Sequence, residues 1–179
     1  MASIYFHEDD YCQIEILPVE NFGFCLQQAG LIDEFAEEHR SGGGYTDIFV
    51  RDANPASIYC KRIPAGIFES AFEGIPKFDE VFSGYSSYRE KCERTSAFGY
   101  DANVAVFYEE KDGFIGNIWL ALDIYEENDV SIACNILALL SNLGDYIIVD
   151  WGWGFIEKLG NTEKIRSYLQ KRLETFSDE

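Results

Sequence analysis

Two histidines, His7 and His39, are the side chains of this chain best suited to act as bases at neutral pH. His7 opens the acidic run 7–10, whose imidazole and carboxylate groups are of the kind that metal sites and hydrolases use. We expect a solvated turn there, and we expect His39, beside Arg40, to stabilise the end of a helix as a cation. Neither histidine is close in the sequence to a nucleophile, and only the fold can bring one near Ser86, Ser87 or Cys92.

The five cysteines are widely separated and odd in number, without any Cys-x-x-Cys pair. Zinc sites and disulfide frameworks need more regular spacing, so the sequence predicts neither a metal site nor disulfides. The chain also lacks the glycine-rich patterns that hold nucleotide phosphates and the Gly-x-Ser-x-Gly of many hydrolases. The sequence therefore predicts no cofactor and favours a protein that is not an enzyme. The alternative that stays open is a small hydrolase or transferase built from His7, acidic loop residues and Cys92.

The charge of the chain indicates what kind of partner it binds. The 32 acidic side chains exceed the 14 Lys and Arg side chains, and the formal net charge is −18 at pH 7. Nucleic acids and anionic membranes require a basic surface that neutralises phosphates, so this balance argues against both as ligands. We expect a cationic partner instead.

The first ten residues carry acidic charge and lack the basic segment and the long apolar run of a secretory signal. The longest nearly apolar run, 135–140, is much too short to span a bilayer. We therefore expect a cytoplasmic location, where cysteines stay reduced. The sequence leaves the oligomeric state open.

The acidic residues gather in clusters at expected turns and element ends, where charge held in place steers a basic partner. Two clusters supply the main candidates for partner contacts, which are Glu34, Glu37, Glu38, Asp123, Glu126, Glu127 and Asp129. Further clusters lie at 8–10, 109–110 and 178–179. Aromatic side chains anchor many interfaces beside charged rims, and the aromatic candidates are Tyr88, Trp151 and Trp153. Because Trp151 and Trp153 are two residues apart at a strand end, we expect them to point the same way.

Residues 103–124 hold the pattern around which the fold is organised. Two apolar runs, 103–108 and 114–124, flank Asp112-Gly113, the strongest hairpin signal in the chain. Apolar side chains occur on both alternating faces of each run, which predicts a central hairpin covered on both faces.

The remaining segments predict further strands and helices. Short strands are expected at 3–6 and 12–17, forming an opening hairpin, with others at 46–50, 58–63 and 146–149. A first helix is expected after an entrance at 18–21, with Glu34, Glu37 and Glu38 near its end and 41–44 terminating it. Further helices are expected at 64–74, 128–143 and 161–176, and 77–99 is expected to be a partly helical connection. Residues 1–179 are thus predicted to form one layered α+β domain, with a mostly antiparallel sheet packed by three or four helices.

A likeness to a known family rests on three segments, namely Tyr11-Cys12-Gln13-Ile14-Glu15-Ile16-Leu17-Pro18, the stretch from Asn21 through the helix to Glu38, and Asp150-Trp151-Gly152-Trp153. In these segments and in length, the chain resembles the bacterial immunity proteins of contact-dependent growth inhibition and related polymorphic-toxin systems. The resemblance implies a small, acidic, cytoplasmic protein without cofactors that binds and neutralises one cognate toxin domain, often a basic nuclease. The candidates named above would then contact the toxin, and the protein would occlude the toxin's active site or substrate surface.

Overall fold

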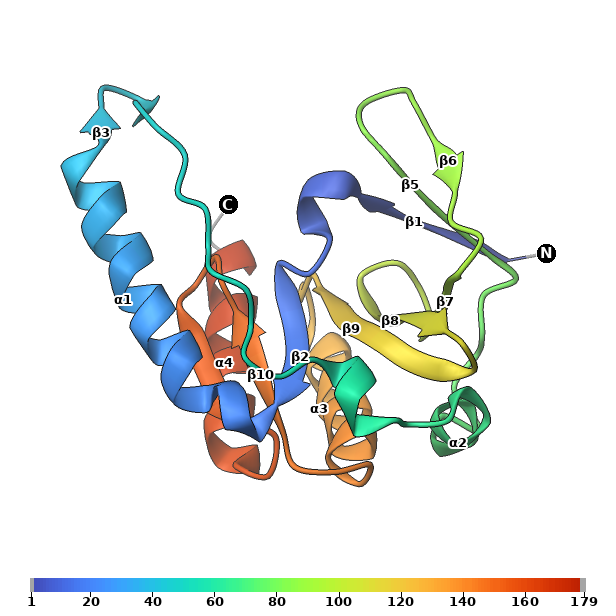
Figure 1. Cartoon of the computed structure of the whole chain (residues 1–179). Coiled ribbons are helices and arrows are strands. Elements are labelled where there is room, and N and C mark those ends of the chain that lie inside the picture. Colours follow the sequence, from blue (N-terminus) through green and yellow to red (C-terminus); the bar gives the residue numbers. More distant parts are fainter. Residues whose placement is uncertain (1, 178–179) are drawn as a thin grey trace.

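A six-stranded antiparallel sheet lies at the centre of the computed structural model, which describes residues 2–177 (Figure 1). In spatial order its strands are β11 (Phe155–Lys158), β10 (Tyr146–Asp150), β2 (Ile14–Pro18), β9 (Phe114–Leu122), β8 (Val104–Lys111) and β7 (Thr95–Gly99). These residues form one α+β domain with four helices and two smaller sheets, so the predicted fold class is confirmed.

Strands β8 and β9 form the predicted central hairpin, in which Val104 pairs with Leu122 and Lys111 pairs with Phe114. Asp112 and Gly113 take positive φ angles of 54° and 78°, as a tight turn between right-twisted strands requires. Alternate side chains of the hairpin point to opposite faces of the sheet, and both sets belong to buried apolar clusters. The expectation that both faces are covered is therefore confirmed.

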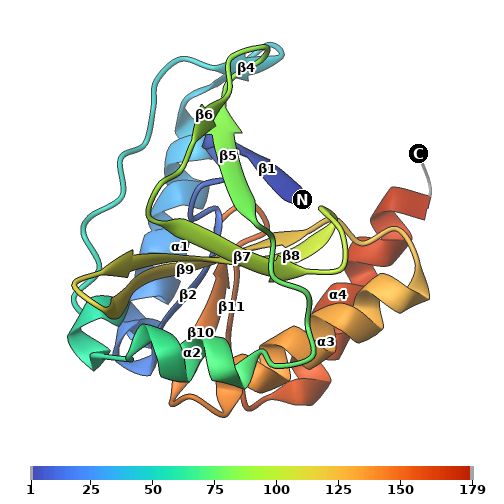
Figure 2. The same cartoon turned by 90° about the vertical axis from the view of Figure 1, so that its right-hand side faces the viewer.

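Three helices cover one face of the sheet, namely α2 (Ala65–Ala71), α3 (Glu127–Ser141) and α4 (Thr162–Ser177) (Figure 2). Helix α3 buries the apolar stripe predicted for it, with Ile136 and Leu140 fully enclosed. Its first turn is capped by a capping box of Glu126 and Asp129.

The opposite face of the sheet is covered in two separate parts (Figure 1). Helix α1 (Phe22–Glu38) lies over β10 and β2, where Cys25 belongs to a buried cluster with Ile147. A small sheet of β1 (Ser3–His7), β5 (Glu80–Gly84) and β6 (Glu90–Lys91) covers the other half, formed by β9, β8 and β7. One face of the sheet is thus covered by three helices, and the opposite face is covered by α1 over one half and by the small sheet over the other half.

The predicted opening hairpin is wrong. Strand β1 pairs in parallel with β5, whereas β2 lies between β10 and β9 in the large sheet. A short 3-10 helix, η1 (Glu8–Asp10), and Cys12, whose φ is 54°, redirect the chain between the two strands. Nearness in the sequence favours a hairpin, but burial of Ile4 and Phe6 against the far half of the sheet decides the pairing.

Other expectations about local structure are also wrong. Residues 77–99 hold β5, β6 and β7 in place of a partly helical connection, and 46–50 form no strand. The segment expected as a strand at 58–63 begins with a 3-10 helix, η3 (Ile58–Lys61), and β11 was not predicted. The missed strands are two to five residues long, too short for alternation to be recognised, and their partners come from distant segments.

Candidate functional site

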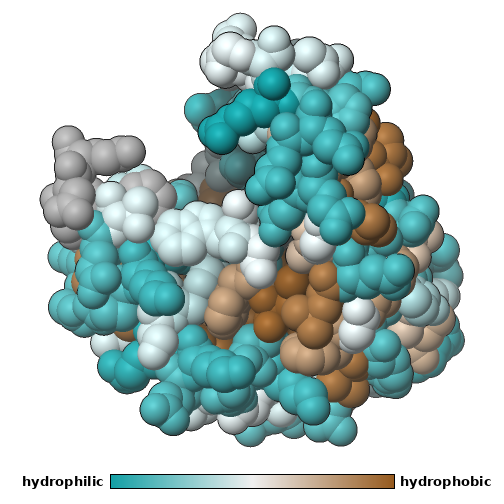
Figure 3. Space-filling view, turned by 90° about the vertical axis from the view of Figure 1, so that its left-hand side faces the viewer, coloured by the Kyte–Doolittle hydropathy of each residue, from teal (hydrophilic) through white to brown (hydrophobic). Residues whose placement is uncertain are grey.

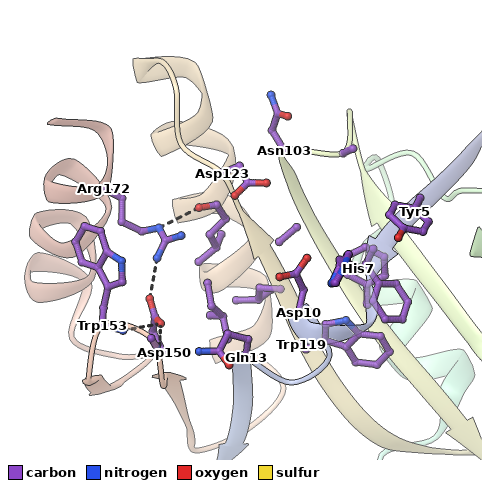
Figure 4. A pocket seen from close by; sticks show the side chains of 18 residues that line it. Tyr5, His7, Asp10, Gln13, Asn103, Trp119, Asp123, Asp150, Trp153 and Arg172 are labelled. Carbon is purple, nitrogen blue, oxygen red and sulfur yellow. Dashed lines mark hydrogen bonds and ion pairs between the residues drawn. The ribbon is translucent and has the colours of Figure 1, made fainter. Parts of the chain in front are cut away.

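A cleft of about 370 Å³ opens where β2 begins and where β9 and β10 end (Figure 4). Strand β1 and η1 form one wall, and the turn after β10 together with α4 forms the other. Its volume lies within the range of about 300–1,000 Å³ that is usual for ligand pockets. Six of the polar residues that line it are His7, Asp10, Gln13, Asn103, Asp123 and Trp153.

Arg172 of α4 ties the strand ends beside the cleft together. Strands β2 and β9 share a short ladder in which Glu15 pairs with Trp119, and the cleft lies beyond it. The Arg172 Nε donates to the Leu122 carbonyl oxygen at 3.0 Å, and its Nη1 donates to Asp150 Oδ2 at 2.8 Å. The guanidinium therefore links the end of β9 to the end of β10.

Asp150 is the centre of a buried network. Its Oδ1 accepts from the backbone N–H groups of Gly152 and Trp153, at 3.0 and 3.1 Å, and its Oδ2 also accepts from the Tyr168 hydroxyl at 2.6 Å. A buried ion pair is tolerated when hydrogen bonds satisfy its remaining atoms, as they do here. Burial and the charge of Asp150 raise the pKa of Tyr168, so this hydroxyl remains a donor. The network fixes the turn after β10 and with it the position of Trp153 at the cleft.

Asp10 and Asp123 give the cleft its free negative charge. Within residues 2–177 neither side chain is engaged in an ion pair or hydrogen bond, although Arg172 acts on Asp123 through space. Burial raises the pKa of Asp123; the charge of Arg172 opposes this shift, and the charge of Asp10 adds to it. With Asp150 counted against Arg172, three acids and one base leave the lining with a formal charge of −2.

His7 lies at the start of η1 and lines the same cleft. Its Nδ1 accepts from the Asp9 backbone N–H at 3.2 Å, and its ring centre lies 4.9 Å from that of Tyr85. The run 7–10 is thus a short capped 3-10 turn whose three acids are exposed, as expected of a solvated turn. His7 and Asp10 also line the cleft (Figure 4), which the sequence did not indicate.

The nucleophiles considered for an enzyme lie elsewhere. Cys92 packs against the cluster under β1 and β5, and its thiol donates to Ser83 Oγ at 3.3 Å. Among the described residues that line the cleft there is no Ser, Thr, Cys or Lys. Residues 2–177 also hold no group of three or more His, Cys, Asp or Glu side chains placed to bind a metal ion. The cleft is chemically suited to bind cationic or N–H-rich groups through its carboxylates.

The predicted acidic cluster at 123–129 is divided by the structure. Asp123 lines the cleft, whereas the Asp129 carboxylate accepts from the backbone N–H groups of Tyr125 and Glu126 at 2.9 and 3.1 Å. Asp129 is 3% exposed, so it stabilises the start of α3 and has almost no surface to offer a partner. Glu127 is exposed and accepts from Gln170 Nε2 at 2.9 Å.

Trp151 and Trp153 lie on opposite sides of the turn after β10, so the expectation that they point the same way is wrong. Trp151 is 8% exposed, belongs to the cluster under α1 and donates its Nε1 to Glu15 Oε1 at 2.8 Å. Trp153 is 43% exposed and lines the cleft beside Tyr168. Residues 151–154 form a turn, where the alternation of a strand does not apply. The third aromatic candidate, Tyr88, is exposed between β5 and β6.

Residues 31–50 form a separate surface, which we call the acidic arm. It comprises the last turns of α1, the hairpin of β3 (Arg40–Ser41) and β4 (Gly44–Tyr45), and the segment that returns along the helix (Figure 1). The rings of Phe35 and Phe49 lie 5.4 Å apart and hold this segment against α1. Against a single Arg40, the arm carries five acidic residues, which are Asp33, Glu34, Glu37, Glu38 and Asp47.

Large apolar side chains remain uncovered on the acidic arm. Ile48 is 83% exposed and Val50 is 82% exposed, and Leu31 of α1 is 39% exposed. The side of the molecule that carries α1 shows hydrophobic surface between hydrophilic residues (Figure 3). Glu34, Glu37 and Glu38 are all exposed here, whereas the acidic pair 178–179 lies outside the described residues.

Sequence reasoning missed the pair of Arg172 and Asp150, although two signals were present. Arg172 lies four residues after Tyr168, within the apolar line of α4, and Asp150 ends the apolar strand β10. A charged residue at a buried position needs an opposite charge, so each of these two residues indicates that a buried partner of opposite charge exists. Nothing in the sequence says which acid and which base come together.

Comparison of this chain with protein-family models, curated proteins and solved structures gave no significant match. Every helix within residues 2–177 is too short or too polar to cross a membrane.

Proposed function

We propose that this protein is a cytoplasmic immunity protein, which binds a cognate basic toxin domain of the nuclease type and neutralises it. It would cover the toxin's active site or substrate surface. An acidic protein can compete with nucleic acid for a basic surface, because its carboxylates take the places of phosphates. The resemblance of the sequence and the net charge of −18 both support a partner of this kind. The five free cysteines are compatible with the cytoplasm.

The observation that carries this proposal is the exposure of Ile48 and Val50, 83% and 82%, within the acidic arm. Covering such side chains is favourable by about 25 cal/mol for each Å² of apolar surface removed from water. Protein interfaces combine an apolar centre with a polar rim, and the acids of the arm provide such a rim. The acidic arm therefore has the composition of a contact surface for a basic protein.

The centre and the rim of the acidic arm have different expected effects on binding. Rim charges act before contact by steering the partner, so they change the association rate and its dependence on salt. Buried apolar contacts form after encounter, so Ile48 and Val50 should control the dissociation rate. The two effects can be measured separately.

The test is co-expression with the basic domain encoded beside this protein's gene, followed by binding kinetics at two salt concentrations. The protein should restore growth. Reversal of three acids, Glu34→Lys, Glu37→Lys and Glu38→Lys, should slow association and weaken its salt dependence, while Ile48→Ser with Val50→Ser should speed dissociation.

A matched control reverses three exposed acids away from the arm, Glu73→Lys, Glu163→Lys and Glu174→Lys. It makes the same change of net charge, so a slower association that is specific to the arm appears as the difference in association rate between the two triple variants. Failure to restore growth, or an affinity indifferent to salt and to all arm variants, would overturn the proposal.

A second function, a small hydrolase or transferase, is favoured by one observation. His7, Asp10 and Asp123 line a single cleft, and burial raises the pKa of Asp123, as happens at many catalytic sites. The same assay separates the two functions through His7→Gln. An immunity protein that acts by binding should still protect cells, whereas loss of protection with unchanged toxin affinity would favour the enzyme.

A further inference from the structure

Two like charges line the cleft without a counter-charge of their own. Arg172 is engaged by Asp150 at 2.8 Å, which leaves the carboxylates of Asp10 and Asp123 turned to the same cavity. Both residues are exposed, and two carboxylates that line one cavity repel each other, so a cationic group between them removes that repulsion. Charge alone does not define a ligand, and a second feature of the cleft is more specific.

Trp119 offers the cleft a hydrogen-bond donor that nothing in the protein uses. Its side chain is 1% exposed, and its Nε1 is the one buried side-chain nitrogen or oxygen of residues 2–177 without a hydrogen-bond partner. Its ring lines the cleft, and its nitrogen edge faces Asp10 and His7 (Figure 4). Its nearest neighbours include the ring of Phe6, with centres 5.3 Å apart, and an aromatic ring is a much weaker acceptor than oxygen.

Native structures rarely leave a buried donor unpaired, so an orphaned N–H at a cavity indicates a missing acceptor. The ligand of this cleft should therefore carry two features, a cationic group for the aspartates and an acceptor oxygen for the indole. Since the nitrogen itself is shut off from solvent, the oxygen must enter with a small shift of the lining side chains.

We propose that the cleft takes an arginine residue of a basic protein partner, with the guanidinium between Asp10 and Asp123 and the backbone carbonyl oxygen on the Trp119 indole N–H. This inference rests on the proposed function, which supplies the basic partner, and it names the residue type that the cleft selects. It adds a second contact region to the acidic arm.

Arginine suits this cleft better than lysine does. A guanidinium is planar and forms paired hydrogen bonds with carboxylates, and it is more weakly hydrated than an ammonium group. A guanidinium also stacks on aromatic rings, as Arg172 does over Trp153 at 5.1 Å and Arg89 over Tyr5 at 4.4 Å. Both rings line the cleft, so a ligand has only their remaining surface to use. The ammonium of lysine is a compact and strongly hydrated charge, which gains less in a partly aromatic site.

The test uses the full chain labelled with ¹⁵N and titrated with N-acetyl-L-arginine methylamide. The chain has 3 tryptophans, so three indole N–H signals report on binding, and single Trp→Phe variants assign them. The Trp119 signal should move downfield as its N–H gains an acceptor. The Trp151 signal should move least, because its N–H already donates to Glu15 and lies in the cluster under α1.

Three related compounds separate the two features of the ligand. Agmatine keeps the guanidinium but has no carbonyl, so it should bind more weakly and leave the Trp119 signal in place. N-acetyl-citrulline methylamide keeps the carbonyl but has no charge, and it should not bind. The lysine analogue should bind more weakly than the arginine analogue.

Asp123→Asn should weaken binding of the arginine analogue about tenfold or more, as loss of a charge-assisted hydrogen bond does. Glu73→Gln, which removes one charge from an exposed site outside the cleft, should leave the affinity unchanged. A Trp119 signal unmoved at the solubility limit of the analogue, or equal affinities for the two variants, would overturn the inference.

These outcomes are distinguishable from failure of the proposed function. A protein that protects cells but ignores the arginine analogue contradicts the arginine pocket and leaves the immunity function standing. If the protein binds the analogue at Trp119 but does not protect cells, the inference of an arginine site in the cleft stands and the immunity function is contradicted.

Discussion

Helices α1 and α3 have similar lengths and similar apolar stripes, but the stripe of α3 is buried and the stripe of α1 is covered only in part. Six of the 15 residues of α3 are buried, against two of the 17 residues of α1, which are Cys25 and Gln28. Helix α3 also starts with acids and a capping box, whereas α1 has no acid in its first turn and ends on Glu37-Glu38, where acids oppose the helix dipole.

The comparison shows that an apolar stripe identifies the face of a helix that avoids water but does not say what covers it. For α3 the cover is the sheet and α4. In the second half of α1, Ile32 still packs against the cluster under the helix, and Phe35 is covered by Phe49 of the segment at 46–50, whose Ile48 is itself exposed, as is Val50. We therefore interpret α3 as scaffold and the end of α1 as surface for a partner.

The largest effect is expected at the ion pair that joins α4 to the sheet. Arg172→Met leaves Asp150 buried without its counter-charge, which should lower the free energy of unfolding by about 3–5 kcal/mol. On the α1 side, Arg51→Met removes the partner of Glu15. Because the Arg51 side chain is 33% exposed, this substitution should lower the free energy of unfolding by less than Arg172→Met does. Urea denaturation measures both, and equal losses would contradict the division.

The next effect compares the two apolar stripes directly. Ile136→Ala in α3 should destabilise the protein by about 2–5 kcal/mol, because it opens a cavity in the core. Leu31→Ala in α1 should change stability by no more than about 0.5 kcal/mol, because water already reaches that side chain. A large loss for Leu31→Ala would mean that the arm is part of the core.

A smaller effect is expected at the helix ends. Asp129→Ala removes the carboxylate that holds two backbone N–H groups at the start of α3, and it should cost about 0.5–2 kcal/mol. Glu38→Ala removes an acid from the unfavourable end of α1 and should not destabilise the protein. Thermal unfolding of both variants would show the contrast, and destabilisation by Glu38→Ala would refute it.

The smallest effect is a change in pH dependence at the cleft. Burial raises the pKa of Asp123 in the folded protein, so between its ordinary and its raised value the folded state binds more proton than the unfolded state. Stability from this group therefore falls as pH rises through that interval. Asp123→Asn should therefore make the decline of stability with rising pH less steep. Unfolding midpoints measured across the acidic pH range test this, and Glu34→Gln on the exposed arm serves as the control. An unchanged profile in Asp123→Asn would contradict the raised pKa.

The sequence by itself determined the features that depend on neighbouring residues. The hairpin at 103–124 was predicted because Asp112-Gly113 specifies its turn and strand alternation needs only a few residues to appear. Helix α1 runs from Phe22 to Glu38, directly after the entrance predicted at 18–21, and α3 and α4 begin and end within two residues of the predicted bounds. The candidate acids Glu34, Glu37 and Glu38 were expected on a helix end, and they lie there exposed.

Only the tertiary structure decided the features that join distant segments. Strand β1 pairs with β5, 77 residues further along the chain at Ser3 and Glu80, and the cleft gathers side chains from β1, η1, β9, β10 and α4. Trp151 and Trp153 differ in exposure because the turn after β10 places Trp151 in the cluster under α1 and Trp153 at the cleft. The physical reason is that strand pairing and burial depend on which segments come together in the folded chain. The sequence pattern shows only which side of each segment is apolar, and it does not show what packs against that side.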